Sequence, residues 1–219
     1  MQKIRKDFNS IAPFESNEWN HNNHYHTFLL ENLPQNCQKA LEIGCGIGTF
    51  SRLLSERAQS ITALDLSPKM IEIAKKLSKS NPNIDFQVAD VLETDFPDEH
   101  FDAIVSITTF HHLPLDELLP KLKKALKPGG RLLILDVLEI KSLKDYFFGA
   151  VAVPISFGFK IFHNGFTKPT EEERKAWEEH SKTDHFLSYS EAQRIYSSYF
   201  EKANLQRHLF FRYSLIWEK

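Results

Sequence analysis

The chain has 219 residues, of which 42% are hydrophobic and 26% are charged, and its formal net charge is −2 at pH 7. This composition is typical of a globular protein and excludes a disordered or fibrous chain, and the small net charge excludes a strong global attraction to nucleic acid or anionic membranes. The two cysteines, Cys37 and Cys45, are too few for a disulfide framework, and no apolar run follows the N-terminal charges. We therefore expect a cytoplasmic protein without a signal peptide.

Residues 1–38 precede the first expected strand and are predicted to form one or two helices, because Tyr25, Phe28, Leu29 and Leu33 have helical spacing. From residue 39, short aliphatic runs alternate with amphipathic segments, which is typical of parallel strands covered on both faces. The expected strands are 40–43, 61–64, 84–88, 101–107 and 132–135. Repeated strand–helix units predict an α/β fold, a Rossmann-like αβα sandwich with a mostly parallel, doubly wound sheet.

Residues 141–186 interrupt this alternation after the fifth strand, and we expect them to form a helical cap insertion within a single domain of residues 1–219. The apolar face of 143–166 is predicted to pack against Phe110 and His111 at the carboxyl edge of the sheet. This face carries Tyr146, Phe147, Phe148, Phe157, Phe159, Ile161 and Phe162. Glycines, a proline and a lysine interrupt the stretch, so we expect no stable membrane insertion, although an element lying on a bilayer surface is an alternative.

Residues 187–219 return to the α/β pattern, with a helix near 190–203 and a final strand that gives the sheet an antiparallel C-terminal edge. The stretch 210–213 contains no glycine, asparagine or proline for a tight hairpin. The sequence therefore leaves two alternatives open: a tight turn near Arg212, or a sheet with six strands instead of seven.

A glycine-rich turn directly follows the first strand, at Gly44, Gly46 and Gly48, and leads into a helix. Glycines permit backbone conformations and a close approach to a ligand that a Cβ would prevent. A dinucleotide fingerprint requires a sixth-position glycine, where this chain has Thr49. The turn therefore favours a nucleotide site over a pyrophosphate site of the dinucleotide type.

Acidic residues follow the next two strands, Asp65 after the second and Asp90 after the third. Asp65 lies about 20 residues beyond the glycine turn, where a carboxylate can accept hydrogen bonds from ribose hydroxyls. Either aspartate alone could be a helix cap, which is the commoner role. Together with the glycine turn at a topological switch point they predict a nucleotide-binding site.

Residues 40–48, 61–70, 86–91, 101–113 and 126–136 resemble the ordered motifs of class I S-adenosylmethionine-dependent methyltransferases. The nearest branch is the small-molecule group that includes the quinone-biosynthesis C-methyltransferases. The resemblance implies S-adenosyl-L-methionine as cofactor and S-adenosyl-L-homocysteine as product. The core that carries it is 39–140, within the single domain.

The resemblance also assigns roles to individual residues. The methionine half of the cofactor is expected at Gly44, Cys45 and Gly46, with Glu42 contacting the ammonium group through water. Asp65 is expected at the ribose and Asp90 at the adenine amino group. The remaining expected cofactor contacts are Leu66 and Met70 on adenine, Val91 beside Asp90, Ser106 near the sulfonium, and Tyr25 or His26 at the methionine end.

Methyl transfer is an in-line displacement that requires alignment, exclusion of water and, for some acceptors, removal of a proton. No covalent nucleophile is required, so Cys45 is interpreted as a loop residue. His111 and His112 follow the fourth strand and are the candidate catalytic residues, because imidazole accepts protons near neutral pH. The alternative is that one of them caps this loop or packs under the helix at 116–126.

A second histidine cluster, His21, His24 and His26, has no acidic or cysteine partner at metal-ligand spacing, so we expect no metal. The leading hypothesis is methyl transfer to an oxygen, nitrogen or carbon atom of a small, partly apolar molecule. The alternatives are a NAD-dependent oxidoreductase and a non-catalytic S-adenosylmethionine-binding module. No basic stripe with interleaved aromatic residues is present, so we do not expect a nucleic-acid partner, and the sequence does not predict the oligomeric state.

Overall fold

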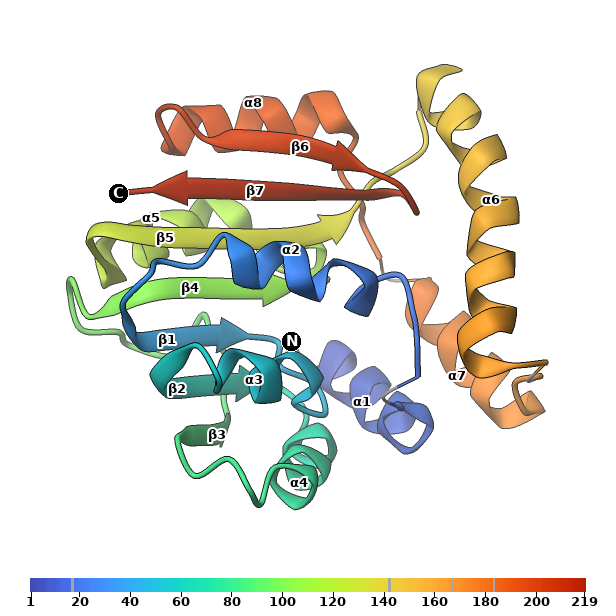
Figure 1. The fold of residues 1–219 in the computed structure, drawn as a ribbon, viewed down its shortest axis with the longest axis horizontal. Helices are drawn as coiled ribbons and strands as arrows, with labels where there is room; N and C mark the ends of the chain where they lie inside the picture. The colour runs from blue at the N-terminus through green and yellow to red at the C-terminus, as the bar shows by residue number, and fades with distance from the viewer. Residues whose placement is uncertain (17, 142, 167, 183) are drawn as a thin grey trace.

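A seven-stranded sheet forms the centre of the protein, with the strand order β3-β2-β1-β4-β5-β7-β6 (Figure 1). The computed structural model describes residues 1–16, 18–141, 143–166, 168–182 and 184–219. Strands β1 to β5 are parallel, and β7 and β6 are antiparallel at one edge. The strands are β1 (Cys37–Ile43), β2 (Ala58–Asp65), β3 (Ile84–Val88), β4 (Phe101–Ile107), β5 (Leu126–Val137), β6 (Asn204–His208) and β7 (Arg212–Glu218). The predicted Rossmann-like fold is confirmed.

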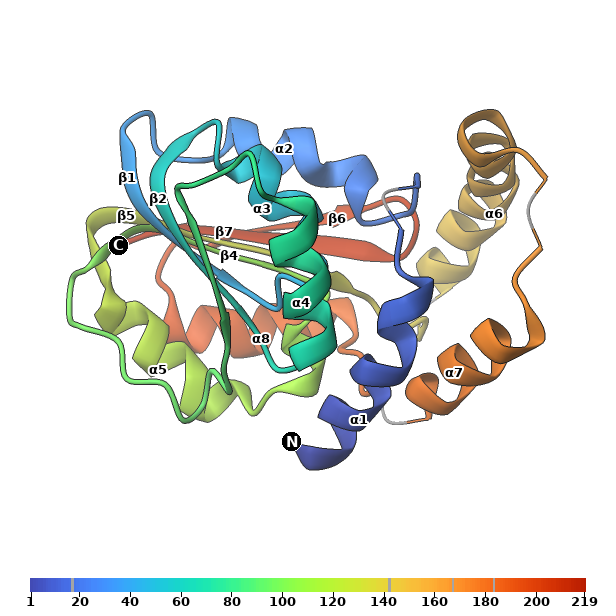
Figure 2. The same ribbon diagram turned by 90° about the horizontal axis from the view of Figure 1, so that it is seen from below.

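Helices cover both faces of the sheet, so an apolar core lies on each face (Figure 2). One face carries α2 (His26–Glu31), α3 (Thr49–Leu54) and α4 (Pro68–Leu77), and the other carries α5 (Leu115–Ala125) and α8 (Tyr189–Tyr199). Local signals explain where two of these helices begin. The Ser67 hydroxyl accepts from Met70 N at 3.2 Å, and Ser188 forms a capping box with Glu191.

The C-terminal hairpin resolves the open question in favour of seven strands. Its turn lies at Phe210 and Phe211, whose φ angles are 59° and 54°. The left-handed region is uncommon for residues other than glycine. The Phe210 ring is buried and stacks on His21 with ring centroids 4.8 Å apart. Burial of this ring offsets the backbone cost, which explains why the turn lacks the usual turn residues.

The cap segment forms two helices, α6 (Leu143–Asn164) and α7 (Glu171–Ser181), and the N-terminus forms α1 (Gln2–Ile11). α6 stands beside the sheet at the end where β4 and β5 finish, while α7 lies against α1 (Figures 1 and 2). Phe159 of α6 stacks on Trp19 at 5.4 Å, and Ser156 Oγ lies 2.6 Å from His21 Nε2. Short 3-10 turns complete the chain at Ala12–Phe14, Asn23–Tyr25 and Phe110–His112.

The predicted packing of α6 against Phe110 and His111 is wrong for the described side chains. The described residues of α6 instead contact the N-terminal segment around Trp19 and the turn between β6 and β7. On α6, the side chains of Tyr146, Phe157 and Phe162 are 64%, 62% and 84% exposed. Phe147 and Phe148 lie outside the described side chains. No helix in the described ranges is long and apolar enough to cross a membrane.

Two glycines offer a matched test of how the loop after β1 is packed. Gly48 and Gly129 both have φ +75°, but a Cβ at Gly48 would lie 2.8 Å from Phe86 Cζ, whereas one at Gly129 would meet open space. We expect Gly129→Ala to lower the free energy of unfolding by about 1–2 kcal/mol through backbone strain. Gly48→Ala should cost about 1–3 kcal/mol more through overpacking. Urea unfolding measures both, and equal losses would contradict the packing.

Candidate functional site

The glycine turn is tied to the neighbouring strands by backbone contacts at the switch point between β1 and β4. Gly44 N and Cys45 N donate to the Leu64 carbonyl of β2 at 2.8 and 2.9 Å. Gly44 has φ +74°, and a Cβ there would lie 2.0 Å from Thr109 Oγ1. Only glycine therefore allows the segment after β4 to approach the loop after β1.

Asp65 connects two loops at the end of β2. Its Oδ2 accepts from Gly46 N at 2.8 Å, and its Oδ1 accepts from Ser67 N at 2.8 Å. The side chain is buried, and burial raises its pKa to about 6 despite these two hydrogen bonds. The carboxylate thus fixes the glycine turn relative to the start of α4 while it lines a pocket.

This pocket lies between α1 and the carboxyl ends of the strands. Five of the predicted cofactor residues line it together: Gly44, Asp65, Leu66, Asp90 and Val91. The Asp90 side chain also accepts a hydrogen bond from Leu92 N at 3.0 Å. Asp90 therefore both caps the turn that follows it and lines the pocket. The rest of the wall includes Met1, Ile4 and Phe8 of α1 and Thr109, His112 and Leu113 beyond β4. The sequence analysis did not foresee α1 in this wall.

Three further predicted cofactor residues do not line this pocket, and their side chains make other contacts. The Ser106 hydroxyl is buried between strands and donates to the Ile43 carbonyl at 2.9 Å. Met70 packs beneath α1 in a small core with Ile11. The Tyr25 hydroxyl donates to the Leu209 carbonyl of the hairpin at 2.9 Å, and burial raises the pKa of this phenol to about 12.

Glu42, Cys45 and His26 stay close to the glycine turn but do not line the pocket. Glu42 is buried and accepts from the Ser51 hydroxyl at 2.5 Å, and burial raises its pKa to about 8. Burial also raises the pKa of the Cys45 thiol, as expected for a loop residue without catalytic activation. The His26 ring packs 5.1 Å from Phe50 on α3, and burial lowers its pKa to about 4.

Glu15 is a further acid at this site that the sequence analysis missed. It follows the 3-10 turn Ala12–Phe14, and burial together with the nearby charge of Asp65 raises its pKa to about 7. Glu15, Glu42 and Asp65 are thus three carboxyl groups whose ionisation is disfavoured by their surroundings. A ligand that brings positive charge and hydrogen-bond donors would stabilise their ionised forms.

His111 is held firmly at the end of β4. Its backbone N–H donates to Asp136 Oδ2 at 2.9 Å, and its ring Nδ1 lies 2.6 Å from Asp136 Oδ1. Asp136, near the end of β5, is buried. Because a carboxylate accepts hydrogen bonds, Nδ1 carries the proton and Nε2 keeps its lone pair.

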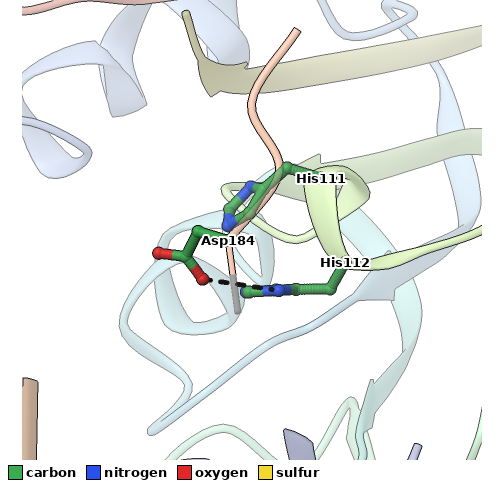
Figure 3. Close-up of side chains that lie close together, drawn as sticks. All are labelled: His111, His112 and Asp184. Atoms are coloured by element: carbon green, nitrogen blue, oxygen red, sulfur yellow. Dashed lines mark ion pairs between the residues drawn. The ribbon is translucent and has the colours of Figure 1, made fainter. Parts of the chain in front are cut away.

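His112 lies beside His111, with ring centroids 4.0 Å apart, so the two predicted catalytic residues are brought together. Burial, and then the neighbouring histidines, lower the pKa of His112 to about 3. The chain after α7 places Asp184 Oδ1 3.7 Å from His112 Nδ1 (Figure 3). Asp184 and His180 were missed, because the sequence between β5 and α8 does not indicate which end of the cap approaches the turn Phe110–His112.

A second pocket of about 570 Å³ opens beside the same turn. His112 and Leu113 line both pockets, and His111 lines only this one. Its other walls come from the turn after β4, α5, the segment before α8, α8 and β7: Phe110, Leu115, Asp116, His185, Leu187, Ile195, Ser198, Tyr199 and Tyr213. The site therefore consists of a pocket at the switch point that contains Asp65 and Asp90 and a second pocket next to it, joined by the histidine turn.

Residues 41–134 match the family described as the methyltransferase domain. The chain is 33% identical over 109 residues to 2-methyl-6-phytyl-1,4-hydroquinone methyltransferase of Synechocystis, covering 49% of this chain and 34% of that protein. It is 31% identical over 98 residues to demethylmenaquinone methyltransferase of Tropheryma whipplei, covering 44% and 41%. The chain thus spans less than half the length of these two relatives.

Among solved structures, the chain is similar to the complex of DhpI with SAH, with a TM-score of 0.65 and 18% identity over 98% of this chain and 94% of that one. It is also similar to PH0226 of Pyrococcus horikoshii, with a TM-score of 0.63 and 20% identity over 89% and 87%. At these identities the likeness establishes the shared fold.

The raised pKa of Glu42 predicts how the stability of the protein depends on pH. Because the folded state raises this pKa from 4.5 to about 8, stability should fall as the pH rises through this window. Glu42→Gln keeps an acceptor for Ser51 but cannot ionise. Urea unfolding should show the variant more stable than the wild type at about pH 8 and little different at about pH 5. Glu56→Gln, at an exposed glutamate after α3, is the control, and an equal pH response in all three proteins would refute the assignment.

Proposed function

We propose that this chain, which belongs to the class I S-adenosylmethionine-dependent methyltransferases, transfers a methyl group to an oxygen, nitrogen or carbon atom of a small, partly apolar molecule. The observation that carries the proposal is the convergence of Gly44, Asp65 and Asp90 on one pocket at the switch point. Three successive strands deliver these groups to the position where open α/β sheets bind ligands.

The residues of the pocket fit S-adenosyl-L-methionine. Asp65 would hold the ribose hydroxyls, Asp90 and Val91 the adenine, and Leu66 and Leu113 would provide apolar walls. Glu15 and Glu42 would face the half of the cofactor that carries positive charge, which matches the raised pKa values of both carboxyl groups. When bound, the cofactor supplies an electrophilic methyl group attached to a sulfonium leaving group.

The chain itself must align the acceptor and exclude water, since in-line displacement needs no covalent nucleophile. The turn at Thr109–Leu113 separates the two pockets, so we place the acceptor in the second pocket, against His111 and His112. The volume of about 570 Å³ is in the range for a small-molecule site. Ile4 and Phe8 of α1 close the cofactor side with apolar surface, which excludes water from the reacting atoms.

The apolar lining of the second pocket favours an acceptor with a ring or an aliphatic part. Leu115, Leu187 and Ile195 provide this surface, while two tyrosines and the histidines provide polar contacts. The relatives named for hydroquinone and demethylmenaquinone methylation support this class of acceptor. We place the reaction in the cytoplasm, in line with the two cysteines, which are free thiols.

Calorimetry with S-adenosyl-L-homocysteine and S-adenosyl-L-methionine tests the cofactor site. Asp65→Ala should weaken binding roughly 100-fold or more, since hydrogen bonds to a charged group contribute about 1.5–3 kcal/mol each. Asp98→Ala is the control, because Asp98 is an exposed acid paired with Lys124 and should bind like the wild type. Circular dichroism checks that Asp65→Ala folds, since Asp65 also anchors Gly46 and Ser67.

Absence of binding by both ligands at millimolar concentration would overturn the proposal. Labelled methyl transfer from the cofactor into a fractionated metabolite extract then tests catalysis. Transfer should be found in apolar phenolic or hydroquinone fractions. Binding without any transfer to the extract would instead identify a non-catalytic binding module.

A further inference from the structure

Three side chains beside the cofactor pocket converge in a way that methyl transfer alone does not require. His111, His112 and Asp184 each offer one ligand atom, and these atoms all lie within 4.8 Å of one another. Two come from the 3-10 turn after β4 and the third from the chain after α7 (Figure 3). Two imidazoles and one carboxylate are a donor set used by catalytic zinc and non-haem iron sites.

The side chains of this cluster are buried, and polar atoms of His112 and Asp184 lack hydrogen-bond partners. The side chains of His111, His112 and Asp184 are 6%, 2% and 9% exposed. Within the described part of the chain, three of the cluster's polar atoms have no hydrogen-bond partner: the two ring nitrogens of His112 and Oδ1 of Asp184. A buried polar group without a partner is destabilising, and more so if it is charged. A cation bound here would coordinate one ring nitrogen of His112 and Oδ1 of Asp184.

The hydrogen bonding of His111 matches that of a metal ligand. Its Nδ1 donates to the buried Asp136 at 2.6 Å, which leaves the Nε2 lone pair free to coordinate. Metal-bound histidines characteristically donate their other ring N–H to a carboxylate or carbonyl, which fixes the ring and increases its basicity. Asp136 also accepts from Val137 N of its own strand at 2.8 Å and from His111 N at 2.9 Å, so its carboxylate is fixed beside the His111 ring.

We propose that His111 Nε2, the His112 imidazole and the Asp184 carboxylate bind one divalent transition-metal ion of the zinc type. Three protein ligands leave coordination positions open, as in catalytic metal sites. His111 and His112 both line the second pocket, so the open positions are accessible to a molecule bound there. His180, whose Nε2 lies 3.7 Å from Asp184 Oδ1, borders the site from α7.

The metal would select the class of acceptor. An ion at the histidine turn would bind an oxygen of a phenol, enol or carboxylate and hold it beside the cofactor pocket. This step rests on the proposed methyl transfer, whereas the metal site itself rests only on the donor set and its burial. The acceptor class then becomes an apolar molecule with an oxygen donor, rather than an unspecified small molecule.

Metal binding is measured on the full chain, without an affinity tag and after removal of bound metal by a chelator. Titration with Zn²⁺ by calorimetry should show one saturable site per chain, and Co²⁺ should give the visible absorption of a low-symmetry site. His112→Gln and Asp184→Asn should each weaken Zn²⁺ binding at least 100-fold. Asp136→Asn should weaken it roughly 10–100-fold, as for other partners of metal-bound histidines.

His185→Gln is the matched control, because His185 follows Asp184 directly but is exposed, and this variant should bind Zn²⁺ like the wild type. Binding that is unchanged in both His112→Gln and Asp184→Asn would show an adventitious ion only and overturn the proposal. Absence of saturable binding to the wild type would also overturn it. If a variant fails to fold, X-ray absorption spectroscopy of the zinc-loaded wild type identifies the ligands of the ion. Two imidazole ligands would support the proposed site, and water ligands alone would overturn it.

Binding of S-adenosyl-L-homocysteine is measured on the same samples, so the two proposals fail separately. Loss of the metal site with cofactor binding intact would leave the methyltransferase proposal standing. Zinc binding without cofactor binding would retain the metal site and reject the methyltransferase proposal. Asp184 does not line the cofactor pocket, so Asp184→Asn should change metal affinity without changing cofactor affinity.

Discussion

The Asp65 carboxylate holds the cofactor pocket together, since it accepts from Gly46 N on one loop and Ser67 N on the next. Without this anchor, the glycine turn and the start of α4 would be separate loops at the ends of two strands. The carboxylate is buried, and burial raises its pKa to about 6 although the hydrogen bonds from the two loops lower it. The same group is then available for a ligand, so structural and binding roles are combined in one side chain.

Features encoded by neighbouring residues could be predicted from the sequence. The five parallel strands follow from aliphatic runs, and the start of α4 follows from Ser67 and Pro68. Gly44, Asp65, Leu66, Asp90 and Val91 meet in one pocket because strand ends of a parallel sheet lie at one edge. The site residues that sequence missed, Glu15, Asp136 and Asp184, are brought in by tertiary packing, and nothing in their local sequence marks their partners.

Tertiary packing also explains why some predicted site residues lie outside the pocket. Tyr25 and Ser106 were assigned to the cofactor because they lie at suitable points in the chain, but the C-terminal hairpin and a neighbouring strand take up their hydroxyl groups. The hairpin turn at Phe210 and Phe211 has no local signal, because its stability comes from aromatic rings contributed by the N-terminal segment. A turn supported by distant side chains cannot be identified from its own residues.

Two electrostatic environments meet at the turn after β4. On one side, burial raises the pKa values of Glu15, Glu42 and Asp65, so a positively charged ligand would favour their ionised forms. On the other side, His112 is neutral and Asp184 lies within 3.7 Å of it, an arrangement that offers lone pairs rather than protons. Phe8 of α1 packs edge-on against His112 and His180, with centroids 5.5 and 4.7 Å away. The same Phe8 side chain lines the cofactor pocket, so one ring of α1 contacts both the pocket and the histidine cluster.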